Sequence, residues 1–129
     1  MLIAGFVFTG IAALIHVYIF VLESLLWTGP RARRIFGIRS VEEAEVTRPL
    51  AFNQGFYNLF LAIAAGAGIV FFAVGAADIG ATLIFVGTGS MVAAGLVLLL
   101  SSPSKARSAL IQLVPPLLAV VLVAVGLTL

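Results

Sequence analysis

Two side chains in the first apolar segment are of types that donate and accept protons in catalysis. His16 is the only histidine of the chain, and Glu23 is the one acidic residue inside an apolar segment. An imidazole and a carboxylic acid are common partners in general acid–base catalysis. On a helix that turns about 100° per residue, both fall on one narrow stripe with Thr9 and Trp27. The stripe predicts an inward helix face with His16 and Glu23 as candidate catalytic residues.

Amide, phenol and indole groups elsewhere in the chain could orient a polar ligand. Four of them follow Pro49 and cover a helix face about 140° wide, and one lies in the last apolar segment, three residues before a Pro-Pro pair. The predicted substrate-binding set is Trp27, Asn53, Gln54, Tyr57, Asn58 and Gln112. The alternative is that these groups are hydrogen-bond links between membrane helices.

The composition indicates how these residues are positioned. The chain has 129 residues, of which 63% are hydrophobic and 9% charged, against roughly 45–50% and 25% in a soluble domain. Four apolar segments are each long enough for a membrane crossing, which takes about 20 residues. We therefore predict an all-α membrane protein, a single domain over residues 1–129 with transmembrane helices at about residues 2–27, 49–75, 79–100 and 105–128.

The positive charges predict the orientation. All seven lysines and arginines lie in loop 28–48 or at the start of the last segment. Both places are on one side of a four-helix topology, and the positive-inside rule assigns that side to the cytoplasm. The prediction is a multi-pass protein of the cell (inner) membrane with both termini outside, loop 28–48 in the cytoplasm, and the polar residues in the cytoplasmic half of the bundle.

Short patterns predict local structure and packing. Ser40 followed by Glu43 forms a capping box and predicts a short separate helix in the loop, with the next helix beginning at Pro49. Gly68 and Gly87 predict close approach of neighbouring helices, because small residues let helix backbones come together.

The order of these motifs resembles a known family. The motifs are His16, Glu23-x-x-x-Trp27, Arg34-x-Phe36-Gly37, Asn53-Gln54-Gly55-x-Tyr57-Asn58, and Gln112 with Pro115. This order resembles the integral membrane proteins of the family called domain of unknown function 1304, over nearly the whole chain. The resemblance implies a four-helix membrane fold and brings no activity with it.

Three functions stay open from the sequence, so whether the chain is an enzyme is undecided. One is a pocket that binds a small amphipathic molecule from the bilayer and acts on it by acid–base chemistry. Another is proton-coupled transport of small hydrophobic compounds, since small multidrug-resistance proteins also have four helices and a glutamate in the first. The third is a non-catalytic assembly subunit.

The sequence also limits the partners. We expect no cofactor and no metal site, because His16 and Glu23 are fewer ligands than a zinc site needs and the chain has no cysteine. The basic charges are too few to indicate nucleic-acid binding. The lipid bilayer is the expected partner, and a parallel homo-oligomer stays open.

Overall fold

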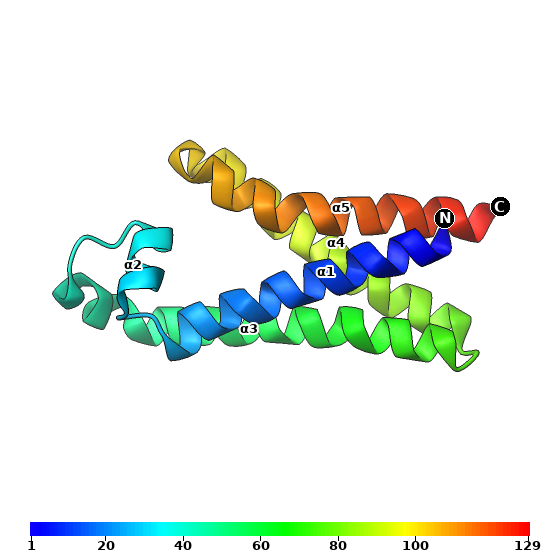
Figure 1. Cartoon of the computed structure of the whole chain (residues 1–129), viewed down its shortest axis with the longest axis horizontal. Coiled ribbons are helices and arrows are strands. Elements are labelled where there is room, and N and C mark those ends of the chain that lie inside the picture. The colour runs from blue at the N-terminus through cyan, green and yellow to red at the C-terminus, as the bar shows by residue number, and fades with distance from the viewer. The chain divides into compact units, whose positions relative to one another are not determined.

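The chain is helical throughout, without strands, in a computed structural model that describes residues 1–129 (Figure 1). This confirms the predicted all-helical class. The elements in chain order are α1 (Leu2–Phe20), the π-helix η1 (Val21–Leu25), α2 (Pro30–Phe36), α3 (Val41–Ala73), α4 (Ala77–Ser101), the 3-10 helix η2 (Pro103–Lys105) and α5 (Ala106–Thr128).

Four helical stretches are long and apolar enough to cross a membrane. They are Leu2–Leu25, Val41–Ala73, Ala77–Ser101 and Pro103–Thr128. Large apolar side chains are exposed along all four, whereas the buried polar side chains are those of Thr9, His16, Glu23 and Thr88. Exposed apolar and buried polar groups are the reverse of a soluble domain, as expected of a multi-pass membrane protein.

The second long helix begins earlier than predicted. It begins at Val41 and continues through Pro49, so the prediction of a separate short helix in the loop was wrong. The predicted cap is present: the Glu43 amide donates to Ser40 Oγ at 3.1 Å, and Glu43 Oε2 accepts from the Arg39 amide at 2.9 Å. A proline inside a helix leaves one carbonyl without its helical partner. The turn around Pro49 is exposed, so that carbonyl is not buried without a partner.

The first long helix ends in a different geometry from the one predicted. Its last turn is π-helical: the Leu26 amide donates to the carbonyl of Val21, five residues earlier, at 3.0 Å. The helical stretch ends at Leu25, and Trp27 follows in a turn. The helix therefore stops two residues before its predicted end, and Trp27 does not continue its stripe.

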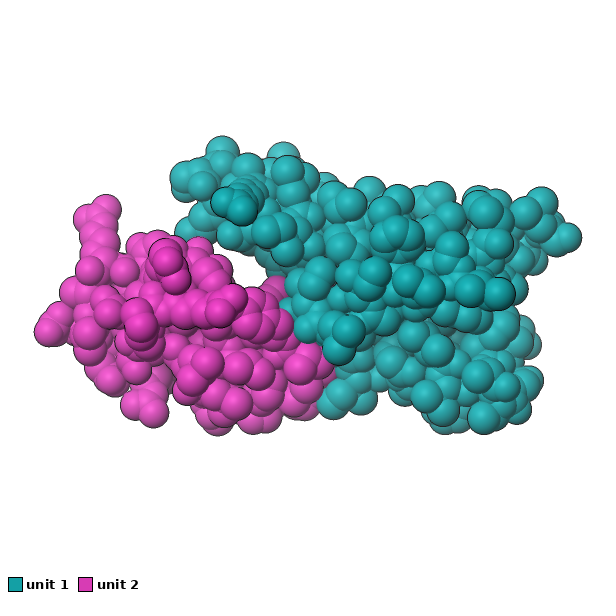
Figure 2. All heavy atoms as spheres, in the orientation of Figure 1, with its two compact units in different colours: residues 1–15, 61–129 teal, residues 16–60 magenta.

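The chain divides into two compact units, coloured separately in Figure 2. Unit 1 comprises residues 1–15 and 61–129, and unit 2 comprises residues 16–60. Helices α1 and α3 each contribute to both. The single-domain assignment stays a prediction.

Glycines bring α3 and α4 together in unit 1. A Cβ added at Gly68 would lie 2.7 Å from Ile84 Cγ1 and 2.8 Å from the Ile84 amide nitrogen. A Cβ added at Gly87 would lie 2.9 Å from the Ala65 amide nitrogen. These contacts are closer than real Cβ atoms make, so the close approach predicted from Gly68 and Gly87 is confirmed. The buried residues of the core cluster are Ala12, Ala65 and Met91.

Candidate functional site

The π-helical turn of unit 2 carries Glu23. The Glu23 side chain is buried, with 8% of the residue exposed, and Asn58 Nδ2 donates to its Oε2 at 2.9 Å. The same Nδ2 donates to the Gln54 carbonyl of its own helix at 3.1 Å, which fixes the amide in place. Single π-helical turns are rare in proteins. The acid therefore has a fixed partner on α3 and an unusual backbone beneath it.

Contact between η1 and α3 depends on Gly55. Ser24 Oγ donates to the Phe52 carbonyl at 2.8 Å, across the two elements. A Cβ added at Gly55 would overlap Ser24 Oγ and lie 3.1 Å from Glu23 Cβ. Any side chain at position 55 would thus push η1 away from α3. The glycine lies in the Asn-Gln-Gly-x-Tyr-Asn motif because the acid of η1 and the amide of α3 must come within hydrogen-bond distance.

Trp27 is held on both sides. Its Nε1 donates to Thr47 Oγ1 at 3.0 Å, and that hydroxyl donates to the Glu43 carbonyl at 3.0 Å. The indole ring also contacts the Phe36 ring of α2, with centroids 4.9 Å apart and planes inclined at 52°. The indole is thereby fixed between α2 and α3.

Basic residues of unit 2 have partners away from Glu23. Arg33 Nε donates to the Thr28 carbonyl at 3.2 Å, and the Arg31 guanidinium lies 5.5 Å from the centroid of the Tyr18 ring. Helix α2, which carries both arginines, ends at Gly37, whose φ of 71° is in the left-handed region that favours glycine. The mixed basic and apolar character of this segment suits the headgroup region.

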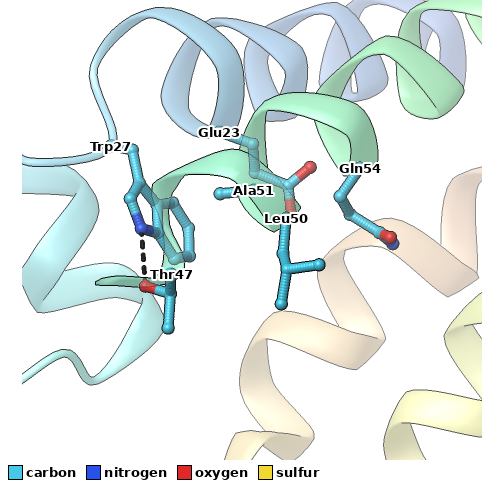
Figure 3. Close-up of a pocket in the computed structure, with 6 residues that line it drawn as sticks. All are labelled: Glu23, Trp27, Thr47, Leu50, Ala51 and Gln54. Carbon is cyan, nitrogen blue, oxygen red and sulfur yellow. Dashed lines mark hydrogen bonds between the residues drawn. The ribbon is translucent and has the colours of Figure 1, made fainter. Parts of the chain in front are cut away.

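Residues of η1, the turn after it and α3 border an open pocket of about 220 Å³ (Figure 3). Its lining residues are Glu23, Trp27, Thr47, Leu50, Ala51 and Gln54. In Figure 3 the Glu23 carboxyl lies between the indole of Trp27 and the side-chain amide of Gln54. Leu50 forms part of the wall and is 74% exposed. The pocket therefore combines a carboxyl, an amide and an aromatic ring with an apolar wall that continues to the outside.

The sequence-predicted site residues divide into groups. Glu23, Trp27 and Gln54 line the pocket, and Asn58 bonds to Glu23. Asn53 is exposed on α3 and does not line the pocket. Only part of the wide polar face predicted for this helix therefore lies at the pocket.

The remaining three predicted residues do not line the pocket. Tyr57 is 66% exposed. His16 is buried in α1, on the predicted inward face. Gln112 lies half-buried in α5 and belongs to unit 1. The roles of all three stay predictions.

Sequence reasoning missed Ser24, Thr47, Leu50, Ala51 and the contact made by Gly55. Helical spacing could have found the residues of α3, because Thr47, Ala51, Gln54 and Asn58 follow one another at steps of four, three and four, which keeps them on one face. The prediction that the helix begins at Pro49 leaves Thr47 outside the helix, so this spacing was not recognised.

Comparison with known proteins gives a family and no further relatives. No curated protein and no solved structure matches the sequence. The model of one family, described as Protein of unknown function (DUF1304), matches residues 10–124. The matched region contains every residue of the pocket and confirms the resemblance inferred from the motifs. The chain therefore belongs to the DUF1304 family.

Proposed function

We propose that this chain is a multi-pass protein of the inner cell membrane whose pocket binds the polar head of a small amphipathic molecule. One observation carries the proposal: the buried carboxyl of Glu23, set in a π-helical turn, faces a pocket with an exposed apolar wall. Ligand sites are concave, mostly apolar and provided with few polar groups that fix orientation. The Glu23 pocket has this composition.

The size of the pocket supports an amphipathic ligand. Its volume of about 220 Å³ is below the roughly 300–1,000 Å³ of sites that enclose a whole drug-sized molecule. A polar head would fill it, and the rest of the ligand would lie outside. Leu50, 74% exposed, offers the apolar surface along which a chain would leave.

The proposed orientation places this pocket in the cytoplasmic leaflet. The basic residues lie between Arg31 and Arg48 and at the start of the last span, and such clusters stay in the cytoplasm. A reporter fused after Leu129 is expected outside the cytoplasm, and one inserted near Arg39 inside it. Equal labelling of both from outside would contradict this orientation.

Acid–base chemistry on the bound molecule would act through Glu23. It is the one lining residue with a titratable side chain, and carboxyl groups act as general acids and bases. His16 does not line the pocket, so in this proposal it makes no direct contact with the ligand and serves as a buried residue of α1.

Trp27 provides a direct test of binding, because it is the only tryptophan of the chain and lines the pocket. Bromine quenches indole fluorescence on contact. We expect 6-bromohexanol to quench Trp27 saturably in the purified protein in maltoside micelles. Gln54→Phe should abolish the saturable part, because a larger side chain would fill the pocket.

The matched control is Asn53→Phe, which adds the same ring at the neighbouring exposed position outside the pocket. It should quench like the wild type. Linear quenching that is identical in all three proteins would mean that no ligand enters. The polar residues would then link helices, as in a non-catalytic assembly subunit.

A further inference from the structure

We propose that the head taken by the Glu23 pocket is a cationic amine, so that the ligand is a cationic amphiphile. This inference rests on the proposed function and names the ligand class of the same site. It has two grounds. The first is the set of lining polar groups that remain available to a ligand, and the second is the charges around them.

The donors of two lining side chains, Trp27 and Thr47, are already used within the chain. The indole N–H of Trp27 is taken by Thr47, and the Thr47 hydroxyl proton is directed to the Glu43 carbonyl. Trp27 therefore presents ring carbon to the pocket. The remaining polar groups of the lining are the Glu23 carboxyl, which only accepts when it is ionised, and the Gln54 amide, which has a donating and an accepting end.

One oxygen of the Glu23 carboxyl accepts a hydrogen bond that fixes its orientation, and the other oxygen is available to a ligand. Asn58 donates to Oε2, and Oε1 receives no hydrogen bond from the chain. A ligand that donates to Oε1 would complete the hydrogen bonding of this buried group. Buried polar groups in native structures generally have their partners, so a donating head fits this position.

No cation of the chain compensates the acid. Neither arginine nor lysine lines the pocket, and the ion pair of the structure joins Arg48 to Glu45 at 3.5 Å, both exposed. Arg33 donates to a backbone carbonyl, and Arg31 lies over the Tyr18 ring. A positive charge beside Glu23 would therefore have to come from the ligand.

An ammonium head uses both features of the pocket. It donates charge-assisted hydrogen bonds to a carboxylate, which are about twice as strong as neutral ones. It is also attracted to the face of an indole, the best of the aromatic rings for cations. A carboxylate head would be repelled by Glu23, and a hydroxyl head would gain only a neutral hydrogen bond.

The test compares three probes that share a six-carbon chain ending in bromine and differ in the head: ammonium, hydroxyl and carboxylate. Each is titrated into the full-length protein in maltoside micelles, and quenching of Trp27 gives its affinity. We expect the ammonium probe to bind at least about tenfold more tightly than the alcohol. The carboxylate probe should bind more weakly than either.

The variant Glu23→Gln isolates the charge. It keeps the size of the side chain and its acceptor for Asn58, and it should lower the affinity for the ammonium probe about tenfold, to that of the alcohol. Glu45→Gln is the control, since Glu45 is exposed and outside the pocket, and it should leave the preference intact. Should Glu23→Gln not fold, Glu23→Asp serves instead: it keeps the charge, and the preference for ammonium must persist.

The outcomes separate this inference from the proposed function. Equal saturable quenching by all three heads would leave an amphiphile pocket and overturn the preference for amines. Absence of saturable quenching by any probe would overturn both. A preference that survives Glu23→Gln would also overturn the assignment to this carboxyl.

A further arm identifies the source of the amine, which could be a free molecule or a lipid headgroup. Ethanolamine-headed lipid is added to the micelles, with diacylglycerol of the same chains as the control. Competition by the ethanolamine lipid alone would assign the head to a lipid. Unchanged binding of the ammonium probe with both lipids would assign it to a free amine.

Discussion

The two units of this chain differ in the side-chain hydrogen bonds that join their elements. In unit 1 the hydroxyls donate to carbonyls of their own helix, Thr9 to Gly5 at 2.8 Å and Thr88 to Ile84 at 2.6 Å. In unit 2, side chains of η1 and the turn after it bond with α3, as the pairs Trp27–Thr47 and Glu23–Asn58 show. Unit 1 is thus held together by packing, and unit 2 has directed bonds between elements as well.

The two units also differ in what their closely packed glycines contact. Gly68 in unit 1 faces backbone and an apolar side chain of α4, whereas Gly55 in unit 2 faces Ser24 and Glu23. A glycine in unit 1 lets helices pack, because small residues allow backbones to approach. The glycine in unit 2 brings an acid and an amide into contact. Similar sequence features therefore serve stability in one unit and a site in the other.

The largest expected effect is loss of packing in unit 1. Gly68→Leu should lower the free energy of unfolding by about 3 kcal/mol or prevent folding, because the side chain would meet the Ile84 backbone. Reversible unfolding in mixed micelles, followed by circular dichroism, measures this. Gly66→Leu, in the same helix with no atom within 4 Å of an added Cβ, is the control and should change stability far less. Equal losses would mean that the α3–α4 contact is not tight.

A smaller effect is expected in unit 2 from Gly55→Ala. Glycine to alanine in an open helix position should stabilise by about 0.5–1 kcal/mol, as we expect for Gly66→Ala. At position 55 the sign should reverse, to a loss of about 1–2 kcal/mol, because the methyl group would overlap Ser24 Oγ. Adding Ser24→Ala should recover part of the loss, and failure to recover any of it in a double-mutant cycle would contradict this contact.

Loss of the hydrogen bond between Glu23 of η1 and Asn58 of α3 should have an intermediate effect on stability. Asn58→Ala removes the donor to Glu23 and should cost about 1 kcal/mol. Asn53→Ala, at an exposed position five residues earlier in α3, should stay within about 0.5 kcal/mol of the wild type. The same unfolding measurement compares them. A larger loss for Asn53→Ala would place the polar contact on the other side of α3.

The smallest expected effect is the coupling between Trp27 and Thr47. Trp27→Phe and Thr47→Val each remove one partner of the 3.0 Å bond. Side-chain hydrogen bonds between membrane helices average about 0.6 kcal/mol in such cycles, and we expect a coupling energy of that size. A coupling of zero would show that the indole is held by its ring contacts alone.

Sequence patterns predicted the elements of unit 1 better than those of unit 2. Helix-forming apolar runs and the glycines at positions 68 and 87 depend on local spacing, which a helical wheel describes well. The stripe through Thr9, His16 and Glu23 was also read correctly, since all three are buried.

The pocket was predicted only in part, for two physical reasons. A helical wheel assumes about 100° per residue, and the π-helical turn at residues 21–25 breaks that assumption just before Trp27. The sequence predicts a helix start at Pro49, but the cap at Ser40 begins α3 eight residues earlier, so Thr47 lies in the helix and not in a loop. Both errors concern places where local geometry departs from the average.

The π-helical turn also has a consequence for chain length. An i to i−5 bond, as between Leu26 and Val21, accommodates one residue more than an α-helical turn holds. A relative with one residue fewer between the positions of Val21 and Leu25 would close this turn as ordinary α-helix and still cross the membrane. It would lose the wide turn that holds the acid. A single-residue deletion at this place, otherwise an unremarkable length difference, would therefore separate relatives that keep the pocket from relatives that keep only the fold.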